Sequence, residues 1–215
     1  MPKDKTQRER RDRPGRDSRE RYNAFAAILL CLRDPRVVAD FGAGGPLPRP
    51  LFLQLGGIFV AVGFVSGAFQ VSLAEFGLES AVVWGIVIAL CSVLRLLVLA
   101  VALLLVAWLA VGNAGYRKLL GGLTLVHILG AIVMAGLTLA ALVVSPGTRG
   151  LAEAPVVRAL ISFAVFLFYM SIYVSGLGDL GCLTSLGLSF IVVLAGQGLQ
   201  SWFGNLLLCL LDGLA

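Results

Sequence analysis

The stretch WGIVIALCSVLRLLVLAVALLLVAWLAVG, residues 84–112, contains 29 residues and one charged side chain, Arg95, near its middle. About 20 apolar residues in an α-helix cross the ~30 Å hydrocarbon core of a bilayer. The stretch therefore predicts a membrane-spanning helix. It also raises the question of why an arginine sits in it.

Composition extends this conclusion to most of the chain. The 215 residues are 59% hydrophobic and 13% charged, with a mean hydropathy of +0.94. Soluble domains contain roughly 45–50% apolar and about 25% charged residues, so lipid must be the solvent for most of this chain. Long apolar runs cover residues 51–73, 81–112, 119–144, 157–175 and 182–211. We therefore expect an all-α integral membrane protein with a five-helix transmembrane domain over residues 50–212.

Charge is concentrated before this domain. Residues 1–50 hold 12 of the 17 Lys and Arg and 7 of the 12 Asp and Glu, a net charge of +5. Residues 1–21 contain no large apolar residue beyond Met1, so we expect a disordered cytosolic tail that favours anionic headgroups. Acids alternate with the bases and no aromatic residue accompanies them, which argues against nucleic-acid binding.

Residues 22–49 are neither as charged as the tail before them nor as apolar as the transmembrane domain after them. Tyr22, Phe25, Leu29 and Leu32 are spaced by three and four residues, which predicts one helical face. The apolar run 24–32 is too short to cross a bilayer. A short helix in the plane of the membrane interface fits it, and an irregular elbow is the alternative. GAGGPLPRP (42–50) then predicts a Gly/Pro elbow leading into the membrane.

The flanking lysines and arginines predict the orientation. With the N-terminus in the cytosol, that side collects the tail, Arg33, Arg36, Arg49, Arg117 and Lys118, 14 basic residues in all. The opposite side collects only Arg149 and Arg158. Five crossings place the C-terminus and Asp212 outside. The lysine-poor, Ala/Gly/Leu/Val-rich composition is typical of GC-rich bacterial genomes, so we expect a bacterial plasma membrane.

Two registers are open for Arg95. Trp84 and Trp108 are ~36 Å apart along one continuous tilted helix, which fits rings at both interfaces and puts Arg95 near the midplane. Alternatively, the span begins at residue 95 and Arg95 reaches the outer interface. A midplane arginine should face the bundle and find acceptors. Counting residues along the helices predicts an intramembrane polar cluster of Arg95 with Gln197, Gln200, Ser66 and the shallower His127. A structural clamp is the preferred role, and a substrate or ion path is the alternative.

Other chemistry is scarce. His127 lacks acidic neighbours for a proton relay, so we expect a neutral ring bonded to Thr124 or to a carbonyl of its own helix. Gly63-Phe-Val-Ser-Gly67 is a GxxxG motif that favours close helix packing. We expect the four cysteines, Cys31, Cys91, Cys182 and Cys209, to be small buried residues, since they form no CxxC pair. No metal, cofactor or catalytic constellation is predicted, and we expect a protein that is not an enzyme.

Three segments carry a resemblance: YNAFAAILLCLRDPR (22–36), VGNAGYRKLLGGLTLVHILGA (111–131) and YVSGLGDLGCLTSLGLSFIVVL (173–194). Together they resemble the Yip1 family of five-span membrane proteins. The proline that this family tends to carry in its third span is missing here, near His127-Ile128-Leu129. The resemblance implies a role in vesicle traffic with small GTPases if the chain is eukaryotic.

These patterns predict a non-catalytic scaffold or membrane-organising protein of the Yip1-like type, in contact with the lipid bilayer and with other membrane proteins or further copies of itself. One alternative is a small transporter or channel subunit with a polar pocket around Arg95, Gln197 and Gln200. Another is an accessory subunit of a larger membrane complex.

Overall fold

The chain folds into helices throughout the part that the structure describes. The computed structural model describes residues 23–72, 78–111, 115–144, 155–178 and 180–212. No strand occurs in these ranges. Their seven helices are α2 (Ala24–Arg33), α3 (Val37–Ala43), α4 (Arg49–Ser72), α5 (Leu78–Val111), α6 (Tyr116–Val144), α8 (Pro155–Gly178) and α9 (Cys182–Asp212). The predicted tail, residues 1–21, lies outside the described residues.

Four of these helices contain segments long and apolar enough to cross a membrane, namely Arg49–Ser66, Ala81–Trp108, Tyr116–Ala140 and Ala159–Gly178. The all-helical, membrane-embedded class expected from composition is therefore confirmed. Helix α5 runs unbroken through Arg95, so the predicted continuous helix is correct and a break at residue 95 is not observed. The described apolar part of α9, Cys182–Gly196, is shorter.

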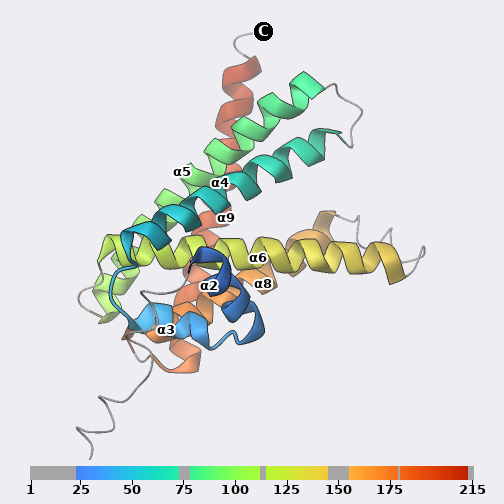
Figure 1. The fold of residues 1–215 in the computed structure, drawn as a ribbon. Coiled ribbons are helices and arrows are strands. Elements are labelled where there is room, and N and C mark those ends of the chain that lie inside the picture. Colours follow the sequence, from blue (N-terminus) through green and yellow to red (C-terminus); the bar gives the residue numbers. More distant parts are fainter. Residues whose placement is uncertain (1–22, 73–77, 112–114, 145–154, 179, 213–215) are drawn as a thin grey trace, which may run out of the picture.

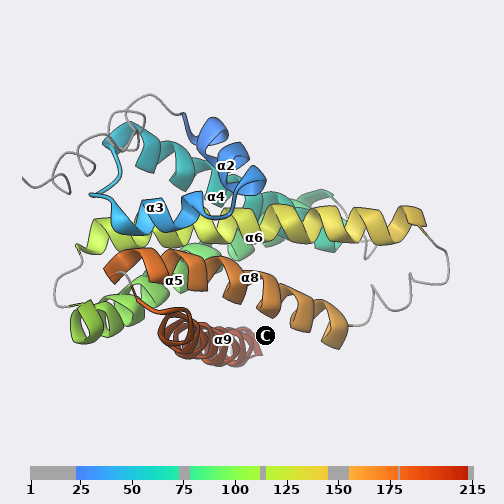
Figure 2. The same cartoon turned by 90° about the horizontal axis from the view of Figure 1, so that it is seen from below.

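The long helices converge at one end. Figure 1 shows the starts of α4, α6 and α9 and the ends of α5 and α8 gathered on the side of the molecule where α2 and α3 lie. From there, α4, α5 and α9 run together in one direction, and α6 and α8 run in another (Figures 1 and 2). The neighbouring pairs α4–α5 and α6–α8 are antiparallel and packed together. We refer below to the converging ends and the spread ends of the bundle.

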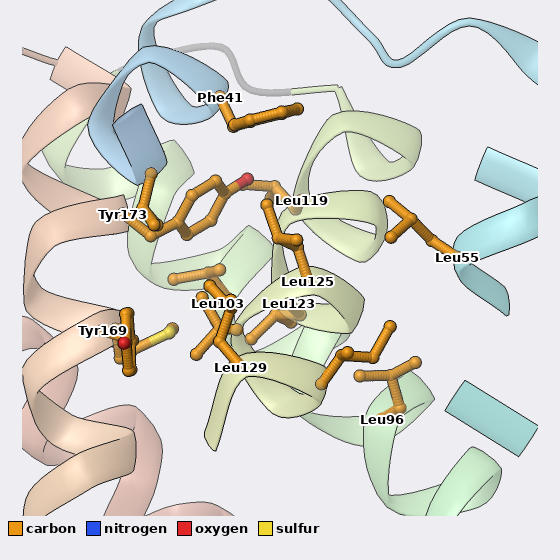
Figure 3. Packing of buried hydrophobic residues seen from close by; sticks show 14 of the residues in the cluster. Phe41, Leu55, Leu96, Leu103, Leu119, Leu123, Leu125, Leu129, Tyr169 and Tyr173 are labelled. Atoms are coloured by element: carbon orange, nitrogen blue, oxygen red, sulfur yellow. The ribbon is translucent and has the colours of Figure 1, made fainter. Parts of the chain in front are cut away.

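The core of the bundle lies at the converging ends. Leucines from α4, α5 and α6 belong to one hydrophobic core with Tyr169 and Tyr173 of α8, part of which Figure 3 shows. The largest fully buried side chains include Leu55, Leu99, Leu103, Leu119, Leu123, Leu125, Leu129 and Tyr173. Toward the spread ends the same helices expose apolar residues such as Val83, Leu139 and Leu160. Exposure of such apolar surfaces to water is unfavourable, whereas contact with lipid acyl chains is not.

Helices α2 and α3 pack against the bundle. The Asn23 side chain caps α2 by accepting from the Ala26 N–H at 2.8 Å. The first helical N–H, of Ala24, donates to Gln54 Oε1 of α4 at 2.9 Å. The helix ends at Arg33, and its C-cap Asp34 has the extended backbone that is favoured before Pro35. The Asp34 carboxylate then accepts from the Arg36 N–H at 3.0 Å and sets the turn into α3.

Close contact between backbones fixes α3 on α8. A Cβ added at Gly176 of α8 would collide with the carbonyl oxygen of Ala39, and one at Gly42 would collide with the carbonyl oxygen of Tyr173. Only glycine permits this approach. The sequence predicted an elbow from residue 42, but the helix continues through Gly42 to Ala43 because Gly42 is where the two helices touch.

Candidate intramembrane polar cluster

Arg95 lies halfway along α5, on the border between its buried and exposed faces. Leu96 and Leu99 beside it are buried, whereas Leu94 and Leu97 are exposed. The guanidinium Nε is buried and has no hydrogen-bond partner among the described residues. A buried donor without a partner costs roughly 1–3 kcal/mol, and more when the group is charged. Burial of Arg95 at this position is therefore unfavourable unless an acceptor binds its Nε–H.

His127 of α6 is held by its own helix. Its Nδ1–H donates to the carbonyl oxygen of Leu123 at 2.9 Å, because a carbonyl can only accept. This bond confirms the predicted pairing with a carbonyl of the same helix. Phe166 of α8 and Phe59 of α4 pack edge-on against the ring, with centroid distances of 4.4 Å and 5.8 Å. The second ring nitrogen, Nε2, is buried without a partner among the described residues.

The two side chains belong to one neighbourhood. Arg95 is on α5 and His127 is on α6, and these two helices pack together. In a neutral ring Nε2 is an acceptor, whereas the Arg95 Nε–H is a donor, so the two nitrogens are complementary. A water molecule or a small polar group could satisfy both. Within the described ranges, no three His, Cys, Asp or Glu side chains gather as a metal site would require.

Helix α9 contacts α5 one turn from Arg95, close to the level that residue counting predicts. A Cβ added at Gly196 would lie 2.5 Å from a methyl carbon of Leu99, one turn of α5 beyond Arg95. The backbone next to Gln197 therefore lies beside α5. The side chains of Gln197 and Gln200 are outside what the structure describes. Ser66, the remaining predicted member, is exposed on α4 and is not part of a buried cluster.

The first glycine of the predicted GxxxG motif packs against another helix of the same chain. A Cβ added at Gly63 would lie 3.3 Å from the Cα of Ala89 and 3.6 Å from the Ser92 hydroxyl, both on α5. Gly63 thus allows α4 and α5 to pack closely. The surroundings of Gly67 are not described.

Sequence reasoning missed a contact between α6 and α8. The Tyr173 hydroxyl donates to the carbonyl oxygen of Lys118 at 3.1 Å, and a Cβ added at Gly122 would collide with the tyrosine ring. Figure 3 shows Tyr173 reaching from α8 toward α6 beside Leu119. Glycines are so frequent, at 26 in the chain, that Gly122 and Gly176 carried no distinguishing signal.

The cysteine prediction holds for one of the described residues. Cys31 is buried, but Cys91 and Cys182 are exposed. Cys91 is on the outer face of α5 and Cys182 starts α9, so the prediction of buried thiols is wrong for both. Burial raises the pKa of the Cys31 thiol to about 12, helped by the carboxylates of Asp40 and Asp34.

Comparison with known proteins adds no relative. The chain matches no protein-family model, no curated protein and no solved structure.

Proposed function

We propose that this chain is a non-catalytic, membrane-organising scaffold of the Yip1-like type. The observation that supports the proposal most is the attachment of α2 and α3 to the converging ends of the bundle. Backbone contacts at Gly42 and Gly176 and the bond from Ala24 to Gln54 hold these short helices in fixed positions. Because α2 and α3 widen only the converging ends, the protein occupies more area in one leaflet than in the other. Such a difference in area is a means of organising a membrane.

The use of polar side chains supports the same proposal. Most hydroxyls with a described bond in the long helices donate to a carbonyl of their own helix, three or four residues back. They belong to Thr124, Thr138, Ser171, Ser175 and Ser185. Such bonds satisfy these hydroxyls within their own helices.

We further propose that α9 crosses the membrane as a fifth span, with the converging ends in the cytosol of a bacterium. Helix α9 has 31 residues, a length of ~46 Å that exceeds the hydrocarbon core. The excess of basic residues near the converging ends supports their cytosolic position.

The alternative function is a transporter or channel subunit. The unpartnered nitrogens of Arg95 and His127 favour it, because a polar pocket inside a bundle could bind a solute. Its key residue would be Arg95.

Reconstitution into lipid vesicles at increasing protein density tests both proposals. A scaffold should change the distribution of vesicle shape and diameter seen by electron cryomicroscopy, without releasing trapped ions or small dyes. The Arg95→Leu variant should behave like the wild type. Solute flux that Arg95→Leu abolishes, with unaltered vesicles, would overturn the scaffold in favour of the transporter.

A further inference from the structure

Helix α2 has apolar side chains on two faces. Ala24, Ala27, Ile28 and Cys31 are buried against the bundle. On the opposite side, Phe25 is 66% exposed and Leu29 is 51% exposed. A helix on a water-facing surface carries polar residues on its outer side. The outer face of α2 is therefore unsuited to water.

Two contacts set the level of α2 along the bundle. The Ala24 N–H is bonded to Gln54, which lies five residues, or about 7 Å, inside α4 from Arg49. Cys31 is fully buried in the core cluster that also contains Tyr169, which lies nine residues, or about 13 Å, inside α8 from its end at Gly178. Helix α2 thus lies alongside the candidate spans and not beyond their ends.

Helix α4 also exposes an apolar side chain next to the residue that α2 contacts. Leu53, next to Gln54, is 70% exposed on a segment that can cross a membrane. The exposed Arg33 and Arg36 follow at the end of α2. Long arginine side chains can reach the headgroup level while their backbone lies deeper.

We propose that α2 is inserted among the acyl chains of the leaflet at the converging ends, with Phe25 and Leu29 in direct contact with lipid. The ligand of this surface is the hydrocarbon of a phospholipid leaflet. An inserted helix that does not cross the bilayer occupies area in one leaflet alone. The inference builds on the proposed membrane-organising function by naming the lipid contact through which it acts.

Site-directed spin labelling tests the depth of α2. Single cysteines replace Phe25 and Leu29 in a chain where Cys91, Cys182 and Cys209 are alanine. Cys31 stays, because its buried thiol does not react. In vesicles of phosphatidylglycerol and phosphatidylethanolamine, collision rates are measured with oxygen, which enters lipid, and with a nickel chelate, which stays in water. Leu53→Cys is the matched lipid-facing control, and Gly45→Cys, at an exposed position before α4, is the water-accessible control.

Labels at 25 and 29 should collide with oxygen as readily as the label at 53 does, and far more often than with nickel. Nickel collisions as frequent as at residue 45 would place the face in water and overturn the inference. Immobile labels that reach neither reagent would show a protein covering the face, which overturns it too. Oxygen-accessible labels in a protein that leaves vesicle shape unchanged would retain the inference and reject the scaffold function.

Discussion

At the scale of single residues, the sequence predicted local chemistry better than contacts between helices. The bond of His127 to its own helix followed from the lack of acidic neighbours, and the structure confirms it at Leu123. Counting residues along each helix placed Gln197 level with Arg95, and the contact of Gly196 with Leu99 puts it less than one turn away. The contact of Tyr173 with Gly122 could not be predicted, because it depends on which faces of α6 and α8 meet.

Gly176→Ala should destabilise the protein. The added methyl group would collide with the Ala39 carbonyl oxygen, a backbone atom that cannot move aside cheaply. Forcing an extra carbon into a packed contact typically costs about 1–3 kcal/mol. Thermal unfolding in detergent measures the loss. Gly187→Ala is the matched control, because nothing lies within 4 Å of its Cβ position, and alanine there should leave stability unchanged or raise it slightly. Equal melting temperatures for both variants would contradict the α3–α8 contact.

Cys31 should resist alkylation. The thiolate is the reactive form, and the pKa is raised from 9.0 to about 12 in the folded protein. At pH 8 the thiolate fraction is therefore about a thousand-fold smaller than in the unfolded chain. Below pH 9 the thiol is protonated in the folded and the unfolded chain alike, and its burial costs no stability. As the pH rises from 9 toward 12, the thiol ionises only in the unfolded chain, and the folded protein loses stability. Mass spectrometry after maleimide treatment should find Cys182 modified and Cys31 spared until the protein is denatured. Rapid modification of native Cys31 would show that α2 is not packed as described.

At the scale of helices, apolar runs located every long element to within a few residues, because a span must be apolar over its whole length. The apolar run 24–32 also located the short helix α2 (Ala24–Arg33), whereas α3 was not predicted. Residues 42–50 were predicted to be an elbow, yet α3 extends to Ala43. Glycine favours turns in water-exposed chains, but at Gly42 it serves a close crossing with α8, and only the tertiary contact distinguishes the two uses.

The pairing of α5 with α9 predicts an energetic coupling between Arg95→Leu and Gln197→Leu. Gly196 packs on Leu99, so residue 197 lies less than one turn of helix from the level of Arg95. Polar contacts between membrane helices average about 0.6 kcal/mol and reach roughly 1.7 kcal/mol. Unfolding free energies of both single variants and the double variant should deviate from additivity by an amount in this range. Strict additivity would remove Gln197 from the polar cluster.

The tail should be dispensable for folding. Residues 1–21 contain no large apolar side chain after Met1, so they have nothing to bury against the bundle. A chain lacking them should melt at the same temperature in detergent as the full chain. A drop of several degrees would show that the tail docks on the protein.

At the scale of the whole molecule, the converging ends carry the core and the spread ends expose apolar surface. Composition alone predicted that lipid surrounds the chain. It could not predict the convergence, since the directions of the helices depend on glycine contacts such as Gly63 with Ala89 and Gly196 with Leu99. The bundle and the attached α2–α3 pair together make the two ends unequal, which is the basis of the proposed function.

Cysteine labelling in sealed vesicles tests this arrangement most directly. Single cysteines at Gly45, Gly115 and Gly181 precede α4, α6 and α9, all at the converging ends, whereas Val156 is in the first turn of α8 at a spread end. All four positions are exposed. In a chain without Cys91, Cys182 and Cys209, an impermeant maleimide should reach 45, 115 and 181 from one side of the membrane and 156 only from the other. Labelling of 156 from the same side as the other three would contradict the bundle described here.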